Sequence, residues 1–184
     1  MSRLEPNPLT TLAPEQRALY DAITTGPRAQ GPQHFALTDK DGNLLGPFNA
    51  LLLSPVLGTA LQEVGASIRY RTSLTARERE IAILIVAAHW DSKFELNAHE
   101  SIGLAVGLTE TEIGCIRSLG IPKLSDLREL ACTHLTRAMV GGDVDDQTWK
   151  AWAPVVGNVT VFELLALVGY YAGLALQMRV FRVG

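Results

Sequence analysis

The fold is decided by the stretch from Leu74 to Leu108, which reads LTAREREIAILIVAAHWDSKFELNAHESIGLAVGL. Its first half begins with Thr75 followed three residues later by Glu78, a spacing typical of a helix N-terminus, and it continues as a long apolar run. Ser92 and Glu95 repeat this spacing before a second apolar segment. The stretch therefore predicts two consecutive α-helices joined by a short turn.

Three ionisable side chains in this stretch form a candidate catalytic centre, namely Glu80, Glu95 and His99. Glu95 and His99 are four residues apart, so they share one face of the second predicted helix. Glu80 lies within the apolar run of the first helix, where a buried carboxylate needs a partner because an unpaired charge is costly to desolvate. A carboxylate beside an imidazole is a common arrangement for proton transfer near neutral pH.

Each of these residues also has a structural alternative. Glu95 can simply complete a capping box with Ser92, and His99 can be a core histidine that pairs with a carboxylate. The partner of Glu80 is either His99 or one of the nearby arginines Arg69, Arg77 and Arg79. Spacing alone leaves these alternatives open.

Four further residues are predicted to bind a substrate: Ser92, His89, Trp90 and Tyr170. The helix that begins after Ser92 presents backbone N–H groups and positive potential, which favours an anionic substrate. His89 and Trp90 end the preceding helix, and Tyr170 lies in the last long apolar segment. The alternatives are a histidine that binds the last helix carbonyls and a tyrosine ring that only packs.

The chain resembles the carboxymuconolactone decarboxylase family, which includes the AhpD-like alkylhydroperoxidases. The resemblance rests on REREIAIL at Arg77–Leu84, HWDSKFELNAH at His89–His99 and GLTETEI at Gly107–Ile113. It extends more weakly to GPFNALLLSP at Gly46–Pro55 and LLALVGYYAGLAL at Leu164–Leu176. The resemblance implies an all-α, AhpD-like helical fold.

The resemblance also implies a reaction. Redox members of the family carry a glutamate, then Cys-x-x-Cys, then a histidine; Glu80 and His99 stand at the first and last of these positions. Ser92 and Glu95 stand where the cysteines would be, so the chain follows the non-redox, decarboxylase-like branch. The implied activity is cofactor-free decarboxylation of a small carboxylated lactone or related ring compound, with His99, Glu95 and Glu80 as catalytic residues. Asn97 replaces a bulky residue of many relatives, which leaves the substrate's shape open.

Other functions remain alternatives. An isomerase or cyclase of the same fold would use the same acid–base pair, and a non-catalytic oligomer would bind small apolar carboxylates without turnover. A thiol-dependent peroxidase is disfavoured because Ser92 and Glu95 cannot supply thiolates. The two cysteines, Cys115 and Cys132, lie far apart and form no redox or metal motif.

Composition narrows the class of protein. The 184 residues suggest a single domain over 1–184, and 47% hydrophobic with 19% charged residues is apolar for a soluble monomer. We therefore expect a homo-oligomer, which the family resemblance specifies as a homotrimer or homohexamer. The net charge of −3, with no run of Lys or Arg, gives no indication of nucleic-acid binding. No HExxH or comparable cluster predicts a metal site.

The N-terminal sequence and the last apolar segment give expectations for where in the cell the protein lies. The N-terminal sequence MSRLEPNPLTT has no long apolar run typical of a secretory signal. The best candidate for a membrane span, Val161–Met178, contains Glu163, and its uninterrupted apolar run is shorter than the roughly 20 residues that a span needs. We therefore expect a cytoplasmic protein with no membrane contact, whose C-terminal apolar segment forms a buried helix.

Helix start signals recur along the chain. We expect an extended arm over residues 1–12, and a covering loop over residues 27–48 with a small hairpin around Asp41-Gly42. A short helix that starts near Asp145 should end before Pro154. The predicted helix starts are Pro14, Pro55, Ala76, Lys93, Glu110, Asp126, Asp146 and Val161.

Overall fold

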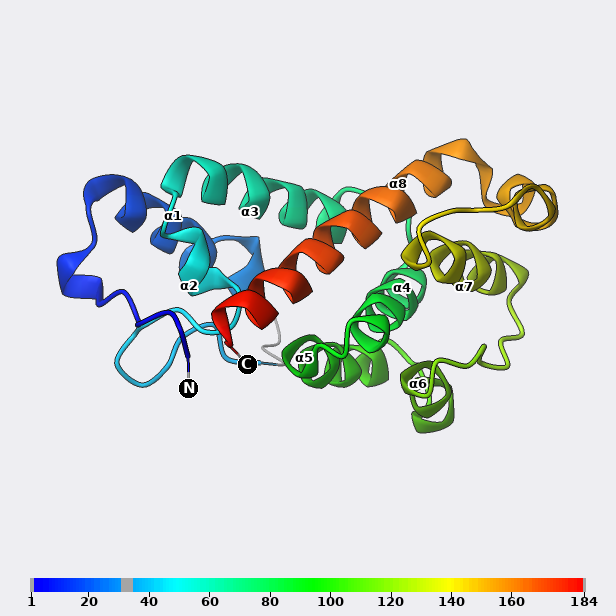
Figure 1. The fold of residues 1–184 in the computed structure, drawn as a ribbon, viewed down its shortest axis with the longest axis horizontal. Coiled ribbons are helices and arrows are strands. Elements are labelled where there is room, and N and C mark those ends of the chain that lie inside the picture. The colour runs from blue at the N-terminus through cyan, green and yellow to red at the C-terminus, as the bar shows by residue number, and fades with distance from the viewer. Residues whose placement is uncertain (1, 31–34, 184) are drawn as a thin grey trace. The chain divides into compact units, whose positions relative to one another are not determined.

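The computed structural model describes residues 2–30 and 35–183, and it is all-α (Figure 1). Within these described ranges, the β structure is a single isolated bridge between Thr38 and Leu44. The chain divides into two compact units, one of residues 1–70 with 176–184 and the other of residues 71–175. The all-α prediction is confirmed, whereas a single domain over 1–184 stays a prediction.

Most helices begin where the sequence predicts. The exceptions are α7, which begins one residue after Asp126 and is capped by its carboxylate, and the last helix. Short 3₁₀ turns add η1 (Leu9–Thr11) within the predicted arm and η2 (Pro27–Ala29) at the start of the predicted loop. The α-helices are α1 (Pro14–Thr25), α2 (Phe48–Leu51), α3 (Pro55–Tyr70), α4 (Ala76–His89), α5 (Lys93–Ala105), α6 (Glu110–Arg117), α7 (Leu127–Val140) and α8 (Asp146–Phe181).

The sequence predicts two helices here, and the structure has two helical segments, but the break between them lies at Gly157 instead of before Pro154. α8 continues through Pro154 and is interrupted only at Gly157, whose φ of 81° and ψ of 161° lie outside the helical range. Proline removes one backbone donor from the helix, whereas a glycine adopts a positive φ without steric cost. The break in α8 is therefore set by the glycine, not by the proline.

Thr160 and Glu163, which resemble a capping pair in the sequence, serve other partners. The hydroxyl of Thr160 accepts a hydrogen bond from Arg128 on α7 at 3.1 Å. The carboxylate of Glu163 accepts from the hydroxyl of Ser73 at 2.6 Å and from its backbone N–H at 2.9 Å. Both residues thus connect α8 to other segments of its own unit instead of starting a helix.

The unit formed by residues 1–70 and 176–184 has its own apolar core. Tyr20 belongs to this core, and its hydroxyl donates to the carbonyl of Gly42 at 2.8 Å. In α3, a Cβ added to Gly58 would lie 2.3 Å from the carbonyl oxygen of Leu51, so glycine permits the close approach of α3 to α2. The short helix α2 was not predicted. The core contains Leu19, Tyr20, Ile23, Leu44, Phe48, Leu51 and Leu52.

The predicted hairpin is confirmed as one turn with a single bridge. The N–H of Asp39 donates to the carbonyl of Asn43, and the N–H of Leu45 donates to the carbonyl of Leu37, both at 2.9 Å. Gly42 takes the positive φ that this turn requires. Residues 31–34 of the predicted covering loop lie outside the described residues.

The unit formed by residues 71–175 is built around α4. Every residue from 81 to 87 is at most 2% exposed, because α5, α6 and α7 all pack against this helix (Figure 1). A helix that is apolar on all sides belongs in a core, which explains the uninterrupted run IAILIVA. Glu80 comes directly before this run and is itself fully buried. The most central helix of the unit thus carries a carboxylate into its interior.

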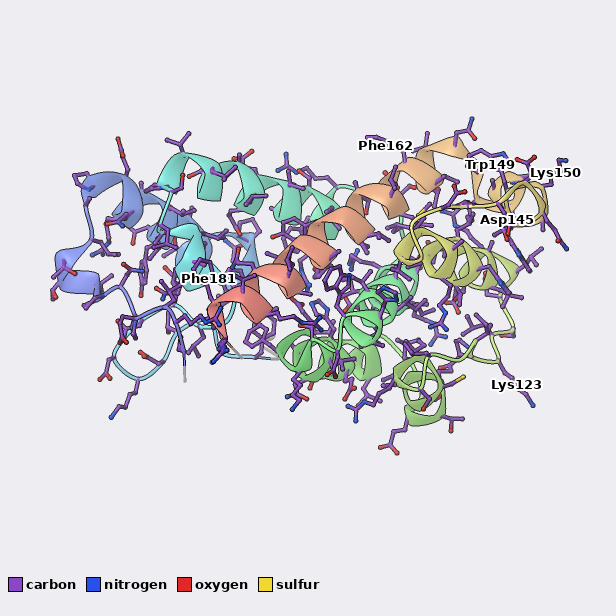
Figure 2. All side chains as sticks on the ribbon, in the orientation of Figure 1. Lys123, Asp145, Trp149, Lys150, Phe162 and Phe181 are labelled. Carbon is purple, nitrogen blue, oxygen red and sulfur yellow. The ribbon has the colours of Figure 1, made fainter. Side chains whose placement is uncertain are left out.

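Among the described residues, α8 alone is long and apolar enough to cross a membrane by length and composition, with a mean hydropathy of 1.8 in its most apolar window. Half of that window is buried, and the core helix of a soluble protein has the same properties. Phe162 and Trp149 lie on the outside of α8, with 71% and 42% of their surface exposed (Figure 2). The helix is therefore compatible with either environment.

Candidate functional site

His99 lies between two carboxylates in the interior of its unit. Its Nδ1 atom is 2.6 Å from Oε2 of Glu80 on α4, and its Nε2 atom is 3.3 Å from Oε2 of Glu95 on its own helix α5. All three residues are at most 3% exposed. The geometry brings together the three residues predicted to be catalytic, and it identifies His99 as a partner of Glu80.

The turn between α4 and α5 positions Glu95. Asp91 adopts a left-handed φ of 48°, its N–H donates to Ala88, and the N–H of Ser92 donates to Ala87 at 2.9 Å. This is the hydrogen-bond pattern of a helix C-terminus closed by a left-handed residue, a position usually filled by glycine. The turn therefore changes the direction of the chain within three residues, so that α5 packs against α4.

The predicted capping box of Ser92 and Glu95 does not form. Ser92 occupies the N-cap position of α5, but its side chain makes no capping hydrogen bond. In a capping box, Glu95 would accept a hydrogen bond from the backbone N–H of Ser92. This N–H already donates to the carbonyl oxygen of Ala87. Glu95 is turned inward to His99 instead, so its acidic group serves the buried centre.

The two carboxylates favour the protonated form of His99. Burial lowers the pKa of this imidazole, but the negative charge and hydrogen bond of Glu80, followed by those of Glu95, outweigh burial and raise it from 6.5 to about 8. A neutral imidazole has one N–H, so it can donate to only one of the two carboxylates, whereas an imidazolium can donate to both. His99 is thus suited to act as an acid near neutral pH.

The arginines near Glu80 form ion pairs with different carboxylates. Arg77 binds Glu129 at 2.7 Å and Glu112 at 3.2 Å, which excludes it as the close partner of Glu80. Arg79 lies near Glu80, with 3.7 Å between its Nε atom and Oε1 of the carboxylate. Glu80 therefore has both a histidine and an arginine beside it.

An aromatic residue outside the predicted set of binding residues also lies at this centre. The ring of Tyr171 on α8 stands edge-to-face with His99, with centroids 5.3 Å apart and planes at 88°. The predicted Tyr170 instead packs edge-to-face against Tyr171, also at 5.3 Å. The signal for choosing Tyr171 is its place on the inward face of α8, four residues after Leu167 and seven after Leu164, both fully buried.

The other predicted binding residues lie at the end of α4. His89 is exposed, and its ring is edge-on to that of Trp90 with centroids 6.3 Å apart. Ser92 is 9% exposed and precedes α5. Their role in substrate binding stays a prediction.

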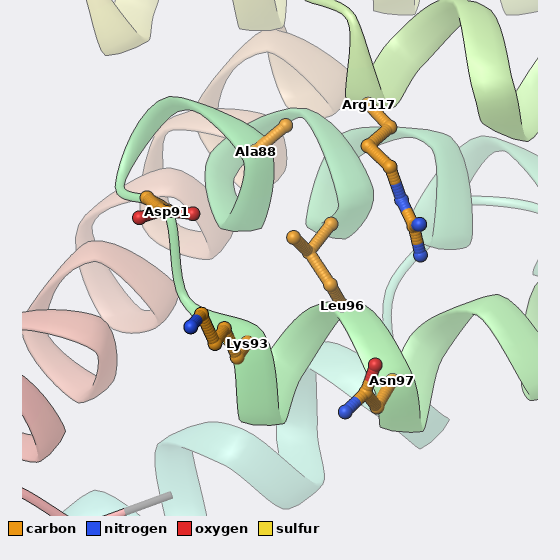
Figure 3. A pocket seen from close by; sticks show the side chains of 6 residues that line it. All are labelled: Ala88, Asp91, Lys93, Leu96, Asn97 and Arg117. Carbon is orange, nitrogen blue, oxygen red and sulfur yellow. The ribbon is translucent and has the colours of Figure 1, made fainter.

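A surface pocket of about 260 Å³ lies where α4, α5 and α6 meet (Figure 3). The guanidinium of Arg117 at its edge is paired with Glu100, whose carboxylate accepts from Nε at 2.8 Å. This pocket contains neither His99 nor any of the predicted binding residues. Its lining residues are Ala88, Asp91, Lys93, Leu96, Asn97 and Arg117.

Neither thiol belongs to the buried centre. Cys132 is buried on α7, and burial, followed by the charge of Glu78, raises the pKa of its thiol to about 12. Cys115 is half-buried on α6, and both cysteines are free. Within residues 2–30 and 35–183, no group of three or more histidine, cysteine or acidic side chains has the arrangement of a metal site.

No protein-family model matches this chain, and no curated protein matches it. The similarity to carboxymuconolactone decarboxylases thus rests on the residues quoted above, and it enters the functional argument as a hypothesis.

Proposed function

We propose that Glu80, His99 and Glu95 form the general acid–base centre of a cofactor-free, decarboxylase-like enzyme that acts on a small carboxylated lactone or related ring compound. One observation carries this proposal: a buried imidazole is held at both ring nitrogens by buried carboxylates. Perturbed, mutually facing titratable groups are characteristic of catalytic sites, although structural ion pairs share this property. The resemblance to the non-redox branch of the family specifies the reaction.

In the proposed reaction, the bond between the substrate ring and its carboxylate breaks and carbon dioxide leaves. The electron pair of that bond passes to the lactone or carbonyl oxygen, which forms an enolate. Protonated His99 then donates a proton to the enolate carbon, and solvent reprotonates the imidazole. Proton transfer by a positioned side chain typically contributes ~10²–10⁴-fold to the rate.

The two glutamates have different parts in this scheme. Glu80 makes the shorter contact and holds Nδ1, which fixes the orientation of the ring. Glu95 lies 3.3 Å from Nε2, so the substrate meets His99 on this looser side and displaces Glu95. We assign substrate contacts to Ser92, His89, Trp90 and Tyr170, and we expect an anionic substrate.

The test is a panel of small carboxylated lactones and related ring acids, followed by carbon dioxide release and by NMR of the products. The His99→Gln variant should lose at least ~100-fold in rate. His134→Gln is the matched control, because His134 stacks on Trp152 at 4.3 Å and lies outside the centre. Ring-shifted products without carbon dioxide would favour the isomerase or cyclase alternative, and binding without turnover would favour the non-catalytic oligomer.

We also propose that the enzyme is a cytoplasmic homotrimer or homohexamer that binds neither nucleic acid nor membranes. The apolar composition and the exposed apolar side chains of α8, such as Phe162 and Leu165, support an assembly that buries surface between subunits. Light scattering at micromolar concentration should give a mass three or six times that of the 19.9 kDa chain. A monomer at that concentration would contradict the assembly.

A further inference from the structure

The carboxylate of Glu80 bridges two positively charged partners. Its Oε2 atom lies 2.6 Å from Nδ1 of His99, and its Oε1 atom lies 3.7 Å from Nε of Arg79. Glu80 is fully buried, and the side chain of Arg79 is only 15% exposed. The two oxygens of one carboxylate are therefore divided between the catalytic imidazole and a largely buried guanidinium.

The charges of this group balance when His99 is protonated. Arg79 and His99 then contribute two positive charges, and Glu80 and Glu95 contribute two negative ones. Without Arg79, the same buried group would carry a net negative charge, which is unfavourable in a poorly solvated interior. Arg79 thus offsets part of the negative charge that surrounds His99.

We propose that Arg79 is a positioning residue of the His99 centre, which lies against the Glu80 carboxylate and, through it, lowers the proton affinity of His99 without contacting substrate. This assignment rests on the proposed function, in which His99 is the acid. Two other arginines have different partners: Arg77, also on α4, binds Glu112 and Glu129, and Arg128 on α7 binds Glu78 at 2.7 Å.

Among the described residues, titratable groups from three helices contact His99. These include Glu80 from α4, Glu95 from α5 itself and the phenol-bearing ring of Tyr171 from α8. Arg79 acts on this set through Glu80. The arginine should therefore change the proton affinity of His99 without a direct contact to the imidazole.

The test is an NMR titration of the ring nitrogens of His99 in the full chain, with ¹⁵N-labelled histidine. Arg79→Gln should raise the midpoint of the titration by about one pH unit, because it removes a positive charge beside Glu80, and a nearby unit charge shifts a pKa by on the order of one unit at the effective dielectric constant of protein sites. Arg79→Lys should restore the wild-type midpoint, since it keeps the charge. Arg117→Gln, which removes an exposed arginine paired with Glu100, is the control and should leave the midpoint unchanged.

An unchanged or lowered midpoint in Arg79→Gln overturns the proposal, and so does a midpoint in Arg79→Lys that matches Arg79→Gln. If Arg79→Gln does not fold, the same titration is made on Arg79→Met, which keeps a long side chain without the charge. A raised midpoint in this variant supports the proposal, and an unchanged or lowered midpoint overturns it. The titration needs no substrate, so an upward shift in a chain that is inactive on every ring acid would refute the proposed function alone.

Discussion

Nδ1 of His99 and Oε2 of Glu80 lie 2.6 Å apart in the interior of the unit built around α4, and neither residue is more than 3% exposed. The contact joins two helices that are consecutive in sequence, and a left-handed Asp91 in the turn between them makes it possible. Glu95 adds a second carboxylate from the other side of the ring.

The free energy of unfolding should depend on pH through His99. Its pKa is about 8 in the folded chain and 6.5 when unperturbed, so its stabilising contribution is fully present below pH 6.5 and is lost as pH rises through 8. The shift corresponds to about 2 kcal/mol. Urea unfolding at pH 6 and pH 9 should reveal this loss in the wild type and not in His99→Gln. Equal pH dependence in both proteins would contradict the assignment.

The two glutamates should differ in their effect on stability. Glu80→Gln removes the shorter contact to a buried imidazole and should cost on the order of 3 kcal/mol, in the range found when one partner of a buried ion pair is removed. Glu95→Gln should cost less, because its contact is longer. Denaturant unfolding of the two variants at pH 7 measures the difference. The reverse order would show that Glu95 is the principal partner.

Asp91→Gly should stabilise the chain. Asp91 has a φ of 48°, and glycine avoids the steric cost that L-residues pay in this region. We expect a gain of about 0.5–1 kcal/mol and an unchanged position of Glu95. Asp91→Val should lower the melting temperature instead. A lower melting temperature for Asp91→Gly would mean that the aspartate side chain itself stabilises the turn.

Peroxide reduction by the cysteines should be absent. Cys132 has a pKa of about 12, so its nucleophilic thiolate is scarce at neutral pH, and it has no adjacent resolving thiol. A coupled peroxide-reduction assay should give the same low background for the wild type and for the double variant Cys115→Ser, Cys132→Ser. Rapid turnover that disappears in the double variant would revive the peroxidase alternative.

Local signals in the sequence were sufficient for most of the fold. Thr75 with Glu78 and Thr109 with Glu112 form the capping boxes that their spacing predicts, so α4 and α6 begin where expected. Ser92 with Glu95 has the same spacing but forms no capping box, because the required backbone N–H is bound by the preceding turn. Identical local patterns thus differ in outcome when the preceding turn takes the backbone N–H and another residue of the same helix, here His99, binds the side chain.

The candidate site was partly predictable for the same reason. The i, i+4 spacing of Glu95 and His99 placed them on one face, whereas the pairing of Glu80 with His99 depends on how α4 and α5 cross. Tyr171 reaches the ring from α8, more than 70 residues later in the chain. Both adjacent tyrosines are buried, and no local pattern specifies which of them contacts His99 until the packing of α8 is known.

The protonation state of His99 tests the central claim most directly. In ¹⁵N-histidine NMR of the wild-type chain, assigned with the His99→Gln variant, both ring nitrogens of His99 should be protonated at pH 7, with a titration midpoint near 8. This result would establish a buried acid held between Glu80 and Glu95. A neutral imidazole at pH 6 would contradict the account, because the carboxylates would then not hold a proton for catalysis.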